Sequence, residues 1–269
     1  DDLTLKDYRV SLDAESEQID LLQPIHADKP YYAEFGWLSP GTKMPSREPV
    51  WTPSRGALSP DHPVPLTWNN GEGLLFEQDF VIDENFLIAI TQRVRNTSTK
   101  DVSIAPYGLI SRTSVPNILG FYILHEGPLG VFDKTLKEVD YDDLFDDGAV
   151  LPAVRQETTG GWIGFTDKYW LVALIPDSDN PLRTSFNAGR RGVEPVFQTD
   201  DLGDVIGVPA GGSIERTDRL FAGAKQVELL DKYAEEQGIE GFDNAVDWGW
   251  FYFLTKPIFY MLHWFFLQF

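Results

Sequence analysis

The sequence predicts a mainly β fold, an all-β sandwich that ends in C-terminal helices. From residue 74 onward, short segments of alternating apolar and polar residues recur, and Gly, Pro, Asn and Asp turns separate them. No helical periodicity lies between these segments, which indicates antiparallel sheets rather than alternating strands and helices. Helical patterns appear only after residue 223, and the stretch 248–269 consists mainly of aromatic and aliphatic residues.

Residues 3–70 show weaker patterns of secondary structure than the rest of the chain. Residues 3–38 hold short alternating pieces and end in an aromatic run at 31–37. Residues 39–70 are rich in proline, which removes a backbone donor and fixes φ, so we expect a surface excursion rather than a central strand. Asn70-Gly71 then marks a turn.

A series of strands follows this turn. Leu74–Ile82 and 86–95 predict a hairpin, because alternate residues of the second segment are apolar and Asp83-Glu84-Asn85 supplies the turn. Further strands are predicted at 102–110, 118–125, 162–165, 169–175, 183–186, 193–199 and 213–221.

Residues 224–237 predict an amphipathic helix. Val227, Leu230 and Tyr233 form an apolar stripe, most of the other positions are charged, and Gly238 is placed to end the helix. We expect the stripe to pack on the sandwich.

The stretch 248–269 predicts a second helix of a different kind. Its two basic side chains, Lys256 and His263, project to one side at about 100° per residue, flanked by Tyr252 and Tyr260. A transmembrane span fits the length, but a central lysine costs about 2.5–3.5 kcal/mol. A buried core helix is a second interpretation. An interfacial helix explains more, namely the narrow polar stripe and the many Trp and Tyr residues.

The expected membrane-interface residues are therefore Trp248, Trp250, Phe251, Phe253, Leu254, Ile258, Phe259, Leu262, Trp264 and Phe265.

Composition and motifs narrow the function. A net charge of −20 argues against nucleic acid and against a domain body that lies flat on anionic lipid. The chain has no cysteine, and its four histidines lack metal-like spacing, so we expect no catalytic residue, metal or cofactor. The acidic run at 140–147 is expected to be a solvated face. Because the chain opens with Asp1 and Asp2 rather than a basic and apolar leader, we expect a fragment of a longer protein.

The most distinctive internal stretch is 160–170, Gly-Gly-Trp-Ile-Gly-Phe-Thr-Asp-Lys-Tyr-Trp. Two short strands joined by Thr166-Asp167-Lys168 form a hairpin with a large aromatic content. The rings belong to the core in one interpretation and line a ligand groove in the other. The candidate interaction residues are Trp162, Phe165, Tyr169 and Trp170, together with Lys256 of the terminal stretch.

This stretch and four others, in order along the chain, resemble the periplasmic domain of the YidC/Oxa family of bacterial membrane protein insertases. They are 31–37, 173–176 (Ala-Leu-Ile-Pro), 220–233 (LFAGAKQVELLDKY), and 247–250 with 255–259 (Thr-Lys-Pro-Ile-Phe). The resemblance implies a β-supersandwich, similar to galactose-mutarotase-like sugar-binding domains, over residues 1–222. It implies a helix packed on the sandwich at 223–241 and an amphipathic interfacial helix at 242–269, leading towards the next transmembrane segment.

The resemblance also implies a function. The domain would be a non-catalytic module, facing the periplasm at the bacterial inner membrane, of a protein that helps insert and fold inner-membrane proteins. Implied partners are nascent membrane proteins, the Sec translocon components SecYEG and SecDF, and the membrane surface. The family's membrane bundle and its groove arginine are absent from this chain. The alternative is a sugar-binding or mutarotase-like protein, which needs a placed histidine and carboxylate, and the sandwich offers only His26, His62 and His125.

Overall fold

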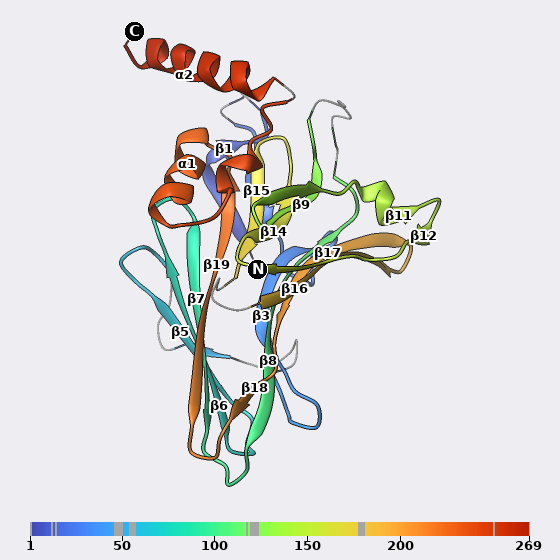
Figure 1. Ribbon diagram of the computed structural model, residues 1–269, viewed down its shortest axis with the longest axis vertical. Coiled ribbons are helices and arrows are strands. Elements are labelled where there is room, and N and C mark those ends of the chain that lie inside the picture. The colour runs from blue at the N-terminus through green and yellow to red at the C-terminus, as the bar shows by residue number, and fades with distance from the viewer. Residues whose placement is uncertain are drawn as a thin grey trace.

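The computed structural model describes residues 2–11, 13, 15–45, 51–53, 58–116, 118, 124–176, 181–249 and 251–268. Two large antiparallel sheets pack face to face, and two α-helices lie at one end of the elongated body (Figure 1). This confirms the predicted mainly β fold with C-terminal helices.

The larger sheet has nine strands among the described residues. In spatial order they are β10 (Thr135–Glu138), β9 (Gly127–Phe132), β14 (Trp162–Thr166), β15 (Trp170–Ile175), β19 (Ser213–Ala224), β7 (Leu87–Asn96), β6 (Leu74–Ile82), β5 (Val64–Asn69) and β4 (Thr52–Pro53). The predicted hairpin is its β6–β7 pair, whose register joins Ile82 to Ile88 and Leu74 to Asn96.

The second sheet is built around β8 (Val102–Thr113). Its path is β13 (Val154–Thr159), β16 (Pro181–Arg191), β17 (Glu194–Gly203), β8 and β18 (Ile206–Val208), and β3 (Tyr31–Leu38) pairs with β8. Two small hairpins are β1 (Leu3–Arg9) with β2 (Gln18–Leu22), and β11 (Phe145–Asp146) with β12 (Ala149–Val150). The helices are η1 (Tyr141–Asp143), α1 (Val227–Glu236), η2 (Phe242–Ala245) and α2 (Tyr252–Gln268).

Three predicted elements differ from the structure. The proline-rich excursion contributes β5 and β4 to one end of the larger sheet. Pro53 lies in β4, the edge strand, where a missing backbone donor is tolerated. The helix predicted from residue 224 begins at Val227, since Ala224 still pairs with Trp170 at the end of β19. The strand predicted at 118–125 falls largely outside the described residues, and its described positions 118, 124 and 125 are not in a strand.

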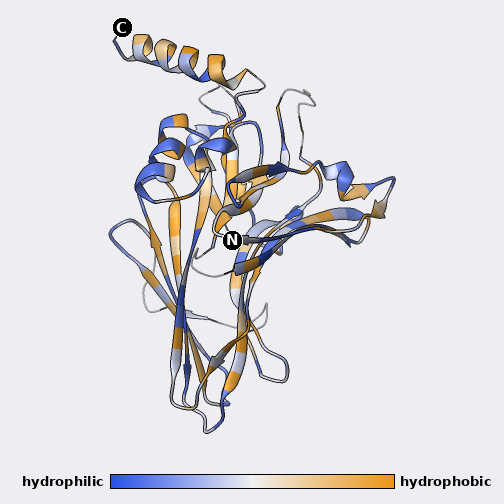
Figure 2. Cartoon of the chain, viewed as in Figure 1, coloured by the Kyte–Doolittle hydropathy of each residue, from blue (hydrophilic) through white to orange (hydrophobic). Residues whose placement is uncertain are grey.

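The core has two layers near the helical end. Along β15, Val172 and Leu174 face the second sheet, whereas Leu171 and Ala173 face α1 and η2. The strand is therefore apolar at every position from 171 to 175, as expected for a strand covered on both faces (Figure 2). Leu230 and Tyr233 of α1 are buried in the outer layer, which confirms that the stripe packs on the sandwich.

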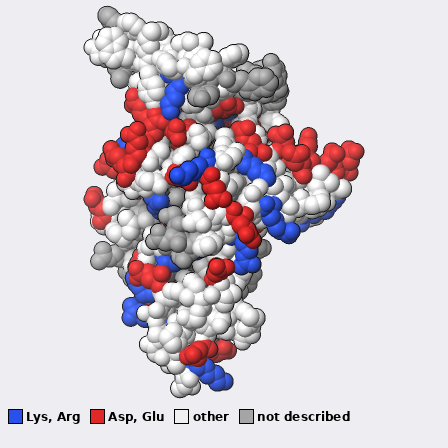
Figure 3. Space-filling view, viewed as in Figure 1, with Lys and Arg blue, Asp and Glu red and all other residues white. Residues whose placement is uncertain are grey.

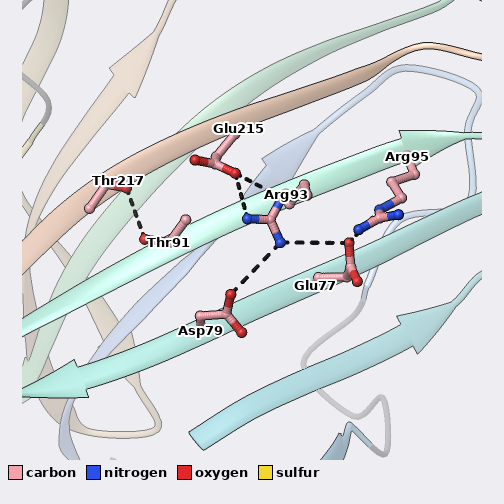
Figure 4. A network of polar contacts seen from close by, with 7 residues as sticks. All are labelled: Glu77, Asp79, Thr91, Arg93, Arg95, Glu215 and Thr217. Carbon is pink, nitrogen blue, oxygen red and sulfur yellow. Dashed lines mark hydrogen bonds and ion pairs between the residues drawn. The ribbon is translucent and has the colours of Figure 1, made fainter. Parts of the chain in front are cut away.

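Away from the helices, the outer face of the same sheet meets solvent. There Arg93 of β7 donates to Glu215 of β19 and lies within 4 Å of Glu77 and Asp79 of β6 (Figure 4). Opposite charges that stand directly across neighbouring strands stabilise their pairing modestly. Near α1 the larger sheet is therefore covered on both faces, whereas away from α1 its outer face is polar and exposed to solvent.

Gly164 in β14 allows the sheet to pack closely. A Cβ atom added there would lie 2.1 Å from the carbonyl oxygen of Val172 and 2.8 Å from Cα of Ala173. Both neighbours are backbone atoms of the paired strand, so a side chain at this position forces the two central strands apart.

We therefore expect Gly164→Ala to lower the free energy of unfolding by roughly 1–3 kcal/mol or more, measured by urea denaturation. Gly207→Ala in β18 is the matched control, because a Cβ there meets nothing within 4 Å. Equal stability of the two variants would contradict the close packing at Gly164.

Candidate functional site

The apolar side chains of α2 point away from the body. Phe266 is 79% exposed, Phe253 66% and Leu262 59%, values unusual for large apolar side chains. The apolar face of α2, as we use the term, consists of Phe251 just before the helix and of Phe253, Leu254, Ile258, Met261, Leu262, Trp264, Phe265 and Phe266. In Figure 3, α2 presents an uncharged surface above a band of acidic side chains.

The length of α2 bears on the interpretations of the terminal stretch. The helix has 17 residues and includes Pro257. Among the described residues, no helix combines the length and apolarity needed to cross a bilayer.

The opposite side of α2 is polar and meets α1 and η2. The Lys256 ammonium lies 3.3 Å from both Asp231 and Asp243, the Tyr260 hydroxyl donates to Asp231, and Nε2 of His263 lies 2.8 Å from Glu228. Positions 256, 260 and 263 share one face, because i, i+4 and i+7 return to the same side of a helix. We call these six residues the polar seam.

The polar seam confines the charge of α2 to its inner side. Burial alone would lower the pKa of Lys256, but Asp243 and Asp231 outweigh it, and the pKa is raised. Burial and the hydrogen bond to Asp231 raise the pKa of Tyr260 to about 12. Lys256 therefore stays charged at neutral pH, held between two carboxylates, and the apolar face carries no ionised group.

A ring contact joins the segment before α2 to the middle of the helix. The Trp248 ring packs edge-on against Phe259, with centroids 5.3 Å apart, and its carbonyl accepts a hydrogen bond from Thr255. Trp248, in the segment before the helix, and Phe259, inside the helix, are thus both half-buried. Of the expected interface residues, Trp250 lies outside the described residues, and the remaining seven belong to the apolar face.

The aromatic hairpin residues divide into two pairs. Trp162 and Phe165 are buried, the first against Phe242 and the second in the core between the sheets, as the core interpretation states. Tyr169 is 58% exposed, and Trp170 is half-buried against Tyr8. Tyr169 and Trp170 line a pocket of about 430 Å³ at the α2 end of the body.

A larger cleft of about 560 Å³ lies between the sheets. Its walls are mostly apolar, with Phe35, Trp37 and Phe80 among them, and the hydroxyl of Tyr107 donates to Glu34 there. None of the body's histidines lines it. Within the described ranges, no group of three or more His, Asp or Glu side chains could hold a metal ion.

The acidic partners of the polar seam were not found from the sequence. In the sequence, Glu228 and Asp231 have the pattern of ordinary solvent-facing residues of α1, and Asp243 belongs to a turn-forming segment before the terminal helix. The signal was present in the spacing, because 228 and 231 share a face of α1 just as 256, 260 and 263 share a face of α2.

Comparison with known proteins gives consistent matches over the whole chain. The family model of the YidC periplasmic domain matches residues 1–261. Membrane protein insertase YidC of Methylobacterium radiotolerans is 40% identical over 99% of this chain and 44% of its own length. The proteins of the same name from Dinoroseobacter shibae and a Ruegeria species are 42% and 43% identical, each over 98% of this chain and 45% of its own length. The chain thus spans less than half the length of these relatives.

Two of the solved structures that match this chain are only remotely similar to it in sequence. A galactose mutarotase-like protein from Lactobacillus casei has a TM-score of 0.46 at 11% identity, over 71% of this chain and 84% of that one. A putative aldose 1-epimerase from Escherichia coli has a TM-score of 0.43 at 11% identity, over 81% of each chain.

The polar seam predicts how firmly α2 is held. Asp231→Asn removes a carboxylate that binds both Lys256 and Tyr260, and each partly exposed pair is worth about 1 kcal/mol or less. We expect faster amide hydrogen exchange throughout α2 and unchanged exchange in the strands. Glu236→Gln is the control, since Glu236 pairs only weakly with Lys232 on α1 itself. Equal exchange in both variants would contradict a role for Asp231 in holding α2.

Proposed function

Because this chain belongs to the YidC family as its periplasmic domain, we propose that it is the module that fixes the geometry of a membrane protein insertase at the membrane surface. The relatives are inner-membrane proteins, and this domain faces the periplasm. In the proposal, α2 lies in the outer headgroup region of the inner membrane and the β body projects into the periplasm. The domain itself acts without catalysis.

The observation that carries the proposal is the apolar face of α2. A water-exposed row of Phe, Trp and Leu is unfavourable in solution, whereas the headgroup region accepts such side chains together with Trp and Tyr. The polar seam supports the same orientation, because it turns the charged side of α2 toward the acidic helix α1.

The proposal assigns a role to each part of the chain. Residues 1–222 form the periplasmic sandwich, residues 223–241 carry the helix that links sandwich and membrane element, and residues 242–269 form the interfacial element. The expected interface residues, Trp250 included, remain proposed membrane contacts.

Partners belong to the proposal as well. The matched relatives are named membrane protein insertases, so nascent membrane proteins are the proposed substrates of the whole protein. The Sec translocon components SecYEG and SecDF are proposed as further partners. Of the four candidate interaction residues in the aromatic hairpin, Tyr169 and Trp170 are the ones with surface to offer a partner. The sugar-binding alternative stays a prediction without a supporting observation among the described side chains.

Vesicle flotation tests the membrane role directly. Phe253→Asp combined with Leu262→Asp removes roughly 1.5–3 kcal/mol of apolar burial at each position. We therefore expect co-flotation of the chain with phospholipid vesicles to weaken at least about tenfold. The matched control is Val193→Asp with Val205→Asp, two exposed valines on the body, which should leave flotation unchanged. Unchanged flotation of the first variant would overturn the proposed role of α2.

A further inference from the structure

A second feature at the α2 end is the pocket of about 430 Å³ beside Tyr169. Three segments far apart in the sequence form it: the end of β1, the turn between β14 and β15, and the junction of β19 with α1. Leu124 completes its wall, together with Val246 and Asp247, which lead into α2. The ends of β1 and β15 and the start of α1 gather at the end of the body where α2 lies (Figure 1).

The charged residues that line this pocket are mostly cationic. Arg9, Lys168 and Lys225 contribute to its wall, against the single carboxylate of Asp247, in a chain whose net charge is −20. Among the described residues, none of the three cations forms an ion pair. The Lys168 ammonium lies 4.7 Å from the centroid of the Tyr169 ring.

Lys225 is the most enclosed of the three cations. Its ammonium donates to the hydroxyl of Thr166 at 2.7 Å, and burial lowers its pKa to about 8. The negative charges of four nearby carboxylates raise this pKa and so oppose the effect of burial. They belong to Asp167, Asp247, Glu126 and Glu138. Asp167 is already bound by Arg112 at 2.7 Å, so part of this negative charge is neutralised elsewhere. An anion in the pocket would have Lys225 as a direct partner.

Three of the other lining residues, Tyr8, Tyr169 and Trp170, are aromatic. Tyr8 packs edge-on against Trp170, and its hydroxyl accepts a hydrogen bond from Gln226, so both rings are held in place. Tyr169 is open to solvent, as is Val10 at the neighbouring turn, which is 67% exposed. Amphipathic rings beside Lys and Arg are the side chains that settle at the headgroup level of a bilayer.

We propose that this pocket binds the phosphate of a phospholipid headgroup once α2 has brought this end of the body to the membrane. The proposal rests on the interfacial placement of α2. It favours a lipid over free phosphate, because the exposed side chains of Val10 and Tyr169 stand next to the cations Arg9 and Lys168. The acidic body still stands away from the surface, and the wall of this pocket offers three cations to a headgroup.

The test compares vesicles that contain phosphate with vesicles that do not. One set is an equal mixture of phosphatidylcholine and phosphatidylglycerol, and the other is a neutral digalactolipid whose headgroup lacks phosphate. Lys168→Glu reverses an exposed charge in a turn. We expect it to weaken partitioning to the phospholipid vesicles at least about fivefold, the effect of one basic residue near the surface, and to leave the galactolipid value unchanged.

Two controls separate the possible failures. Lys100→Glu makes the same charge change in the β7–β8 turn, at the far end of the body, and should weaken neither partitioning (Figure 1). If Lys168→Glu and Lys100→Glu behave alike while the parent chain still binds both vesicle types, the headgroup site is wrong and the role of α2 stands. If the parent chain binds neither type, the proposed function fails with it. Saturable calorimetric binding of inorganic phosphate, lost in Lys168→Glu without any change in vesicle partitioning, would reassign the site to a free anion.

Discussion

The contact of Lys256 with Asp231 and Asp243 decides how the rest of this end of the molecule is arranged. A lysine in the middle of an otherwise apolar helix has to reach either water or a carboxylate, and here it reaches two carboxylates on α1 and η2. Tyr260 and His263, which share its face, then lie against the same acidic surface. With its polar side held inward, α2 has only its apolar face to present outward.

This arrangement depends on where the sandwich places α1. The strands near α1 are covered on both faces, and Leu230 and Tyr233 seat the helix on them. The hydroxyl of Tyr233 also donates to Asp83 in the β6–β7 turn, which ties α1 to the end of the hairpin. A change in the sheet near Leu171 or Phe221 is therefore expected to reach α2 through α1.

Elements with local periodicity were predictable from the sequence. The hairpin of β6 and β7, the long strand β19 and the stripe of α1 follow from alternation and helical spacing, and their ends differ by only a few residues. The strands β4 and β5 at one end of the larger sheet were not predicted, because proline argues against a central strand but not against a place at or near an edge. The polar stripe of α2 was visible in the sequence. Spacing also places residues 228 and 231 on one face of α1, but pairing residue 231 with residue 256 requires the turn between the two helices, which the sequence does not give. The pocket beside Tyr169 was hidden for the same reason, since its walls come from residues 8–9, 124, 168–170, 224–226 and 246–247.

The most direct measurement is the membrane depth of α2 in the folded chain. The chain has no cysteine, so one introduced cysteine can carry a single spin label. The labelled variants are Phe253→Cys and Leu262→Cys on the apolar face and Lys232→Cys on α1. In the presence of vesicles, the collision rate of each label with oxygen and with a water-soluble nickel complex would be measured. We expect the two α2 labels to meet oxygen and be shielded from nickel, and the α1 label to meet nickel freely. Nickel access to both α2 labels, or shielding of the α1 label alone, would contradict an α2 that lies in the membrane with its polar seam turned toward the domain.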